Sequence, residues 1–382
     1  MRKLLNIFLL TIVSAYLLSS CESCTQKRER TKTVIKEKID TVIVQNTKEK
    51  EVIKVIYDTV YVETDSLEEV PEPVKKVKAP PLRSWNDTKT KQQIINFVNT
   101  VTDKNSLYYV KPSERIAVFD QEGTLWPEKP LYFQIEFMFD RIKQLLPDHP
   151  EWKKDRIVKA ALERDQEKIK KFGGEGLFKL SMLTQSNMTV SEYNKIILDW
   201  INNSKHPVTG KLYKDMVYKP MVDLFTYLKE NRFKVYIVTE SGYGFIRPWV
   251  EQVYGIPKEQ VIASRRKLKW HEINGKHVLL RDPKILYIND KANKVISIEQ
   301  IIGKRPIMAF GNSDNDIFML QWTAEGSNKH LAALIHHTDA EREWAYDKDS
   351  KIGHLDEGLS LAKKDGWLIV DMKNDWKVIY RD

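Results

Sequence analysis

The chain has 382 residues, enough for one large domain or two modest ones with extensions. Hydrophobic residues make up 42% and charged residues 30%. This balance is typical of a globular body, and the lack of a long apolar run excludes a polytopic membrane protein. The net charge of +9 comes from 62 basic residues scattered among 53 acidic ones, a pattern typical of a solvated surface, so no nucleic-acid binding is expected. Both cysteines, Cys21 and Cys24, lie near the N-terminus, which excludes disulfides, thiolate catalysis and cysteine-bearing zinc sites from the rest of the chain.

The N-terminus has the pattern of an export signal. The basic start Met1-Arg2-Lys3 precedes a mostly apolar run over 4–18, the length of a secretory signal core. The run ends in Leu18-Ser19-Ser20-Cys21, which resembles the lipobox of bacterial lipoproteins. The resemblance implies a signal peptide over residues 1–20 and a lipid on Cys21. That lipid would anchor the protein in the inner or outer membrane of the cell envelope. The alternative is an ordinary signal peptide with an incidental cysteine.

Residues 21–85 are expected to form a low-complexity tether. The stretch 22–84 has no glycine, almost no aromatic residues, and abundant Lys, Glu, Thr and Val. A short repeat starts at Val34-Ile35-Lys36 and again at Val52-Ile53-Lys54, and prolines at 71, 73, 80 and 81 stiffen the end of the segment. A tether that holds a catalytic body off the membrane is the favoured interpretation, and a stalk that binds a partner is the alternative. No protein partner can be identified.

From residue 86 to 382 helices and strands are expected to alternate. The region 131–205 is expected to be almost wholly helical. Such alternation is typical of an α/β fold with a doubly wound, mostly parallel sheet. In chain order we expect a helix at 92–101, a strand at 115–119, a helix at 220–229, strands at 234–239 and 261–263, a hairpin turn at Asn274-Gly275, and strands at 306–310, 331–335 and 367–370.

Polar motifs follow the strands at the edge where such sheets place their active sites. Asp120-Gln121-Glu122-Gly123-Thr124 follows the first strand and Thr239-Glu240-Ser241-Gly242 follows the second. Asn289 to Lys294 comes next, and Gly311-Asn312-Ser313-Asp314-Asn315-Asp316 follows a later strand. These motifs resemble those of the haloacid dehalogenase superfamily, and in such a site a carboxylate at Asp120 can attack phosphorus, while Glu122 can protonate the leaving oxygen and then activate water. Thr239 and Lys294 can bind phosphoryl oxygens, and the loop 311–316 offers oxygen ligands for Mg²⁺.

Together these four motifs resemble the haloacid dehalogenase superfamily, in particular its phosphoserine-phosphatase-like branch. The resemblance implies a Rossmann-like core and a Mg²⁺ held by Asp120, by residue 122 through its backbone carbonyl, and by the loop 311–316. Within that loop Asn312 and Asp316 are the predicted ligands, with Asp314 left open. Thr239 as a mere helix cap, and Lys291 in place of Lys294 as the phosphate partner, are also left open. The adjacent His336 and His337 are expected to point to opposite faces of a strand, which argues against a zinc site.

Two residues depart from the family pattern. Glu122 stands where the family usually has Asp, which moves the carboxyl by about 1.5 Å, roughly one C–C bond. Asn312 stands in the first acidic place of the metal loop and brings an oxygen without a charge. Both changes bear on rate and metal affinity more than on the fold.

The long helical insertion, about 127–218, resembles the cap that superfamily members place over the site, with a purely structural subdomain as the alternative. A cap of this size indicates a small phosphorylated metabolite as substrate. The expected function is therefore a Mg²⁺-dependent phosphatase, a phosphomonoesterase that is either phosphoserine-like or a broad acid phosphatase. A non-catalytic lipoprotein with a binding role is the first alternative, and a haloacid dehalogenase is the second.

Overall fold

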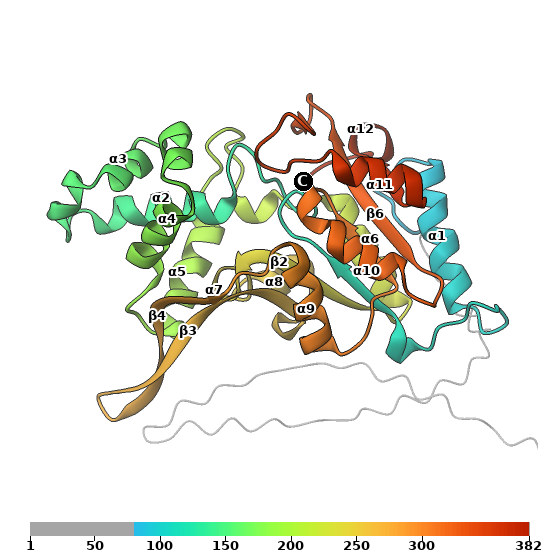
Figure 1. Ribbon diagram of the computed structural model, residues 1–382, viewed down its shortest axis with the longest axis horizontal. Helices are drawn as coiled ribbons and strands as arrows, with labels where there is room; N and C mark the ends of the chain where they lie inside the picture. The colour runs from blue at the N-terminus through green and yellow to red at the C-terminus, as the bar shows by residue number, and fades with distance from the viewer. Residues whose placement is uncertain (1–79, 382) are drawn as a thin grey trace, which may run out of the picture. The chain divides into compact units, whose positions relative to one another are not determined.

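The computed structural model describes residues 80–381, which belong to the unit Lys76–Asp382 (Figure 1). The predicted signal peptide, the lipid site at Cys21 and most of the tether lie outside the described residues. Leu82 and Trp85 are both buried, so the folded body takes in residues slightly before the predicted boundary at 86. Among residues 80–381, no helix combines the length and the apolar character needed to cross a bilayer.

An eight-stranded sheet forms the centre, in the order β4-β3-β2-β1-β5-β6-β7, with β8 paired to β6. The pairs β1–β2, β1–β5, β2–β3, β5–β6 and β6–β8 are parallel, whereas β3–β4 and β6–β7 are antiparallel. The predicted α/β class with a mostly parallel sheet is therefore confirmed. The strands are β1 (Ile116–Phe119), β2 (Lys234–Gly242), β3 (Val261–Ile273), β4 (Lys276–Tyr287), β5 (Met308–Gly311), β6 (Leu331–Thr338), β7 (Ala345–Tyr346) and β8 (Leu368–Asp371).

Two hydrophobic cores cover the two faces of the sheet. Every residue of β1 is buried, and successive side chains point to opposite faces, as expected of a strand covered on both sides. Ala117 and Phe119 join one core, and Ile116 and Val118 join the other. The first core includes residues of the helices α1 (Lys89–Thr102), α6 (Lys219–Glu230) and α8 (Val250–Tyr254). The second includes residues of α9 (Lys291–Ile302), α10 (Ile317–Ala324) and α11 (Glu357–Asp365). The sheet is thus doubly wound.

The helices divide between these two layers and a separate group. They are α1 (Lys89–Thr102), α2 (Phe133–Leu145), α3 (Arg156–Leu162), α4 (Gln166–Gln185), α5 (Val190–Asn203), α6 (Lys219–Glu230), α7 (Tyr243–Ile246), α8 (Val250–Tyr254), α9 (Lys291–Ile302), α10 (Ile317–Ala324), α11 (Glu357–Asp365) and α12 (Met372–Asp375). The helices α2 to α5 form a group of their own at one end of the body and lie within the stretch 127–218 for which a helical cap was predicted (Figure 1).

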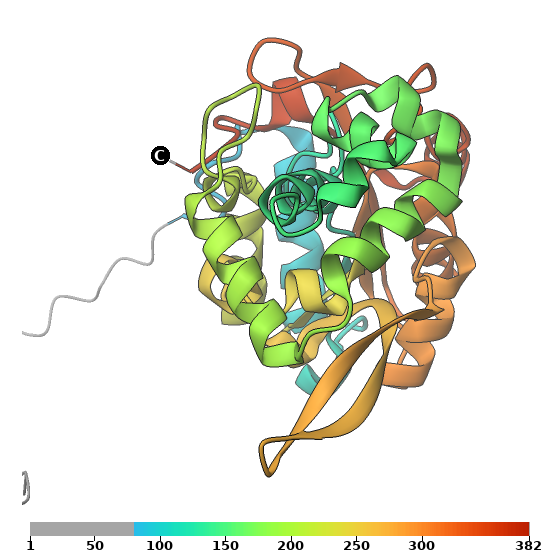
Figure 2. The ribbon, with the colours of Figure 1, turned by 90° about the vertical axis from the view of Figure 1, so that its left-hand side faces the viewer.

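The hairpin β3–β4 adjoins this helical group. Asn274 and Gly275 both have positive φ, 51° and 72°, as the predicted two-residue turn requires. Figure 2 shows the hairpin projecting beyond the helices. Closer to the sheet, Leu280 of β4 forms an isolated bridge with Thr189, the residue before α5. The hairpin therefore ties the helical group to the edge of the sheet.

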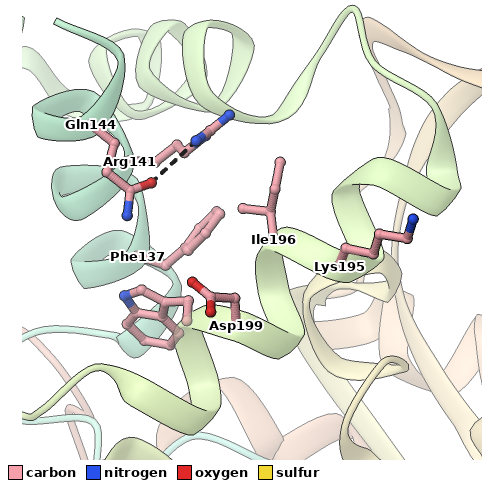
Figure 3. Close-up of a pocket in the computed structure, with 7 residues that line it drawn as sticks. Phe137, Arg141, Gln144, Lys195, Ile196 and Asp199 are labelled. Atoms are coloured by element: carbon pink, nitrogen blue, oxygen red, sulfur yellow. Dashed lines mark hydrogen bonds between the residues drawn. The ribbon is translucent and has the colours of Figure 1, made fainter.

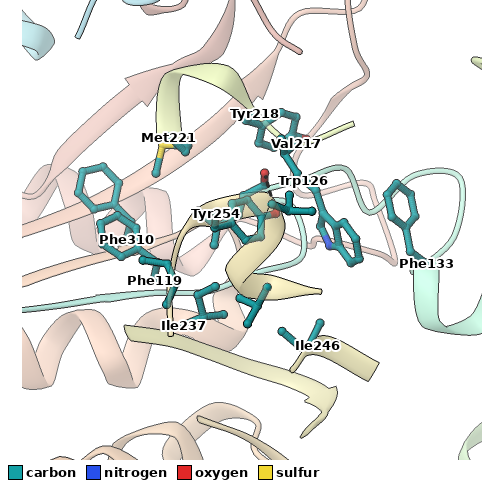
Figure 4. Packing of buried hydrophobic residues seen from close by; sticks show 14 of the residues in the cluster. Phe119, Trp126, Phe133, Val217, Tyr218, Met221, Ile237, Ile246, Tyr254 and Phe310 are labelled. Carbon is teal, nitrogen blue, oxygen red and sulfur yellow. Dashed lines mark hydrogen bonds between the residues drawn. The ribbon is translucent and has the colours of Figure 1, made fainter. Parts of the chain in front are cut away.

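Buried aromatic rings pack beneath the loop that follows β1 (Figure 4). Phe119 stacks on Phe310 of β5 with ring centroids 5.1 Å apart, and its edge contacts Phe225 of α6. Further along the loop, Trp126 stacks on Trp249 at 4.8 Å and contacts Phe133 at the start of α2 at 4.6 Å. Aromatic pairs of this kind contribute about 0.5–1.5 kcal/mol each beyond the area they bury. They fix both ends of the segment that carries Asp120 and Glu122.

Candidate active site

Asp120 lies at the carboxyl end of β1, between the neighbouring strands β2 and β5. Its backbone N–H donates to the carbonyl of Phe310 at 2.9 Å, which continues the pairing with β5. The side chain is buried, and its Oδ1 accepts from Nζ of Lys294 at 2.5 Å. Asp120, which was predicted to follow the end of a strand, is therefore a buried carboxylate with the ammonium of Lys294 beside it.

Lys294 joins two carboxylates across the site. It comes from α9, and its Nζ donates to Oδ1 of Asp120 and, at 2.6 Å, to Oδ1 of Asp316. The other oxygen of Asp316 accepts from the backbone N–H groups of Asn312 and Ser313 at 3.0 and 3.1 Å. Both oxygens of Asp316 are thus engaged, and this residue orients Lys294. The alternative phosphate partner, Lys291, is exposed on the same helix.

Glu122 points to the end of β2. Its Oε2 accepts from Thr239 Oγ1 at 2.6 Å, and its Oε1 accepts from Ser241 Oγ at 2.5 Å. The backbone N–H of Ser241 donates to Thr239 Oγ1 at 2.9 Å, which fixes that hydroxyl. Thr239 therefore does more than cap a helix, because it holds the second acid in place. Ser241 was not predicted as a site residue, although it lies in the polar segment 239–242 that follows the second predicted strand.

Gly123 turns the chain so that Glu122 can reach β2. Its φ is +75°, a conformation that side chains with a Cβ rarely adopt. A Cβ built on Gly123 would also lie 2.0 Å from Nδ2 of Asn312. The glycine is therefore required both by the backbone conformation and by the close approach of the loop after β5.

The ionisation of the two acids reflects their burial. Burial raises the pKa of Asp120 well above its ordinary value, and the carboxylate of Asp316 raises it further, whereas Lys294 opposes the shift. Burial also raises the pKa of Glu122, although the hydrogen bonds from Ser241 and Thr239 limit the rise. Glu122 is thus protonated at higher pH than an exposed glutamic acid, which suits a proton donor.

The pKa values of Lys294 and Glu128 also depend on their burial and on the charges around them. Burial alone would lower the pKa of Lys294, but the adjacent Asp120 and Asp316 outweigh it and raise that pKa, so the ammonium stays charged. Burial raises the pKa of Glu128 to about 7. The cluster around Lys294 thus contains one lysine and four carboxyl groups, those of Asp120, Glu122, Glu128 and Asp316. A further cation would offset the excess of negative charge.

Two side-chain oxygen atoms in this cluster are of the kind that binds a hard divalent cation. Oδ2 of Asp120 and Oδ1 of Asn312 both lie near Thr124 Oγ1, at 3.5 and 3.1 Å. No group of three or more acidic, histidine or cysteine side chains able to hold a metal is present among residues 80–381. Mg²⁺ does not need one, because it keeps several water ligands and is usually bound through one or two carboxylates together with substrate phosphate.

Asp314 has a different task from its neighbours in the loop. Its carboxylate accepts from the backbone N–H groups of Asp356 at 3.2 Å and Gly358 at 2.9 Å. Both belong to the start of α11, where four backbone N–H groups lack partners within the helix. Asp314 thus caps this helix. Asn312 is the residue of the loop 311–316 whose side-chain oxygen shares the hydroxyl of Thr124 with Asp120.

A buried polar chain supports the Gly123 turn from behind. His337 lies with Nε2 2.8 Å from the carbonyl oxygen of Gly123 and with Nδ1 3.1 Å from the carboxylate of Glu343. Tyr218 donates to the other oxygen of Glu343 at 2.7 Å. The neighbouring His336 is partly exposed, so the two histidines do face opposite ways as predicted. No supporting role was predicted for His337 from the sequence.

A separate pocket of about 250 Å³ lies between α2 and α5. Figure 3 shows Phe137, Ile196 and Asp199 around it, with Arg141 donating to Gln144 at 3.1 Å. None of its lining residues belongs to the cluster around Asp120. The pocket is therefore a feature of the helical group rather than of the acidic site.

Comparison with known proteins gives structural neighbours only. No protein-family model and no curated protein matches the chain. Similar solved structures include a conserved functionally unknown protein from Anaerococcus prevotii DSM 20548, with 16% identity over 68% of this chain and 89% of that chain and a TM-score of 0.46. A phosphoserine phosphohydrolase-like protein from Francisella tularensis subsp. tularensis SCHU S4 has 16% identity over 58% and 87%, with a TM-score of 0.34. A HAD family hydrolase from Salmonella enterica subsp. enterica serovar Typhi has 15% identity over 64% and 67%, with a TM-score of 0.33.

Proposed function

We propose that this protein is a Mg²⁺-dependent phosphomonoesterase that works through a phosphorylated Asp120. One observation carries the proposal. A buried carboxylate, Asp120, meets a lysine at 2.5 Å at the end of the central strand, and a second buried acid, Glu122, lies two residues further along the same loop. A nucleophile, a fixed positive charge and a proton donor are the three groups that transfer of a phosphoryl group to a carboxylate requires.

Asp120 and Asn312 are the side chains that would hold the cation. Asp120 would use Oδ2, because Lys294 already binds Oδ1, and Asn312 would use Oδ1. The backbone carbonyl of Glu122 would complete the protein's share, whereas the side chains of Glu122 and Asp316 are engaged elsewhere. When bound, Mg²⁺ neutralises the repulsion between the carboxylate and the phosphate dianion.

The two steps follow from the positions of the two acids. Asp120 attacks phosphorus, the bond from phosphorus to the ester oxygen breaks, and Glu122 gives its proton to that oxygen. Lys294 stabilises the charge on the phosphoryl oxygens during the transfer. In the second step Glu122, now ionised, takes a proton from water, which attacks phosphorus and releases phosphate from Asp120. The hydroxyls of Thr239 and Ser241 keep Glu122 aligned for both steps.

The substrate class we propose is a small phosphorylated metabolite. The helices α2 to α5 are inserted directly after the loop with Asp120 and Glu122, as a cap over the site would be. Phosphoserine is one candidate, since several structural neighbours are described as phosphoserine phosphatases. A broad acid phosphatase is the other candidate, because the fold itself does not select a substrate.

The test is hydrolysis of an aryl phosphate by the full-length protein, with Mg²⁺ and with a chelator. We expect turnover that needs the metal and is lost in Asp120→Asn, an isosteric change that removes the nucleophile. Asp314→Asn is the matched control in the loop 311–316, because the carboxylate of Asp314 binds the start of α11 and is not assigned to the cation. Turnover that persists in Asp120→Asn would contradict the proposal.

We also propose that the protein is a lipoprotein of the bacterial cell envelope, attached to a membrane through Cys21. The support is the pattern Leu18-Ser19-Ser20-Cys21 after an apolar run. Metabolic labelling with a fatty acid should mark the wild-type chain and leave Cys21→Ser unlabelled. Equal labelling of both chains would contradict the anchor at this residue.

A further inference from the structure

We propose that Glu128 supplies a negative charge to the divalent-cation site by acting through the side chain of Asn312. Glu128 is then a positioning residue for the cation, and it offsets the absence of a carboxylate at residue 312. The inference rests on the proposed function, because the cation is the one assigned there to Asp120 and Asn312.

The contact between Glu128 and Asn312 is direct and buried. Oε1 of Glu128 accepts from Nδ2 of Asn312 at 2.7 Å and from the hydroxyl of Tyr346 at 2.8 Å. Only 2% of Glu128 and 1% of Asn312 is exposed. On the other side of the same amide, Oδ1 of Asn312 accepts from Thr124 at 3.1 Å. The carboxylate therefore holds the amide nitrogen, and the amide oxygen points to Thr124, whose hydroxyl also lies 3.5 Å from Oδ2 of Asp120.

Two glycines leave just enough room for this pair. A Cβ on Gly123 would lie 2.0 Å from Nδ2 of Asn312 and 2.6 Å from Oε1 of Glu128. A Cβ on Gly353 would lie 1.9 Å from the same Glu128 oxygen. Both glycines have positive φ, 75° and 66°. The backbone thus closes around the carboxylate and the amide from two directions, which fixes their geometry.

The chemistry of the pair explains why residue 312 is an amide. An aspartate there would set two carboxylates about as close as the present 2.7 Å contact, which is unfavourable unless one of them takes up a proton. An amide instead donates to Glu128, and a hydrogen bond to a charged group is stronger than one between neutral groups. That bond increases the negative charge on Oδ1, the atom that faces the cation. Partners of this kind behind a metal ligand typically alter metal affinity by about 10–100-fold.

The ammonium of the adjacent Lys129 binds elsewhere and does not hold the carboxylate of Glu128. Its ammonium donates to the carbonyl of Ile352 at 2.9 Å and to the hydroxyl of Ser350, and it lies over the ring of Tyr346 at 4.2 Å. It is thus held by the segment 346–352, whereas the carboxylate of Glu128 is held by Asn312. The charge of Glu128 remains directed to the amide.

The experiment measures binding of Mn²⁺ to the full-length protein at about pH 8, above the pKa of Glu128, from the electron paramagnetic resonance signal of free Mn²⁺. Glu128→Gln keeps an oxygen that can accept from Asn312 and Tyr346 but removes the charge, and we expect about 10–100-fold weaker binding. Glu128→Gln/Asn312→Asp moves the charge onto the ligand itself, and we expect most of the affinity to return. Glu136→Gln is the matched control, because Glu136 is also a buried carboxylate but is paired with Arg164 in the helical group.

A second readout needs no metal. Asn312→Asp alone sets two carboxylates side by side, so without Mn²⁺ we expect a lower Tm than in the wild type and recovery in the double variant. The inference is overturned if Glu128→Gln binds Mn²⁺ as the wild type and Glu136→Gln do, if the double variant binds no better than Glu128→Gln, or if the wild type binds no Mn²⁺. Mn²⁺ binding without aryl-phosphate turnover would refute the proposed function and leave this inference standing.

Discussion

Replacing Lys294 with Met should destabilise the fold and should do so more at high pH. Lys294 is buried between two acidic groups, and its Nζ lies 2.5 Å from Asp120 and 2.6 Å from Asp316. Methionine is close in volume but carries no charge. The variant would leave two buried carboxylates facing each other without the cation that joins them.

The magnitude follows from those distances. Two oxygens bound to the same nitrogen lie no more than about 5 Å apart, and two unit charges at that separation repel by about 3 kcal/mol at an effective dielectric constant of about 20. Removing one partner of a buried ion pair costs about 3–5 kcal/mol. We therefore expect Lys294→Met to lower the free energy of unfolding by about 3–5 kcal/mol at about pH 8.

The pH dependence has a definite sign. Without Lys294 the repulsion from Asp316 raises the pKa of Asp120 further in the folded state, so the folded chain binds more protons than the unfolded chain. Stability of the variant relative to the wild type then falls as pH rises through that raised pKa. At about pH 5, closer to protonation of Asp120, we expect a smaller loss than at about pH 8.

The assay is urea unfolding followed by circular dichroism at about pH 5 and about pH 8. Lys304→Met is the control, because Lys304 and its partner Glu114 are both exposed and such pairs contribute about 0–1 kcal/mol. The reasoning fails if Lys294→Met costs no more than Lys304→Met, or if its cost is the same at both pH values.

Three further predictions concern the loop after β1. Glu122→Gln should lower kcat/KM for an alkyl phosphate by about 10²–10⁴-fold and less for an aryl phosphate, whose oxygen leaves more easily without a proton; equal losses would contradict the role as proton donor. Because burial raises the pKa of Glu122, kcat for the alkyl phosphate should fall as pH rises through that pKa, and a rise would contradict this assignment. Gly123→Ala should lower the free energy of unfolding by more than Gly210→Ala, since both glycines have positive φ but only a Cβ at Gly123 meets Asn312. Gly210→Ala is the control and isolates the backbone strain of about 1–2 kcal/mol. Equal losses in the two urea titrations would contradict the close approach between Gly123 and Asn312.

Strand ends were the features that the sequence could identify. Asp120, Thr239 and the loop 311–316 each follow a run of apolar residues, and the carboxyl ends of parallel strands meet at one edge, so their convergence was predictable. Lys294 was predicted to bind phosphate, which stays a prediction; the structure shows that Lys294, a buried lysine of α9, reaches Asp120, whereas Lys291 is exposed. The core could be predicted because the strands have the apolar pattern of a sheet covered on both faces.

The supporting contacts could not be predicted in the same way. Glu128 and Asn312 are 184 residues apart, and His337 and Gly123 are 214 residues apart. No local pattern marks which distant side chains meet, because such contacts depend on how the loops close over the sheet. Asp316 is a further example. The sequence shows an acidic residue in the loop 311–316, but it does not show that both carboxylate oxygens already accept hydrogen bonds.

The central claim is that a phosphoryl group is transferred to Asp120. The most direct measurement is an acid quench of the full-length protein during turnover of a substrate with a radiolabelled phosphoryl group, followed by proteolysis and mass spectrometry of the labelled peptide. The account predicts a label on the peptide with Asp120, bound as an acyl phosphate that hydroxylamine releases, and no label in Asp120→Asn. Turnover without any labelled peptide, or a label on another residue, would contradict it.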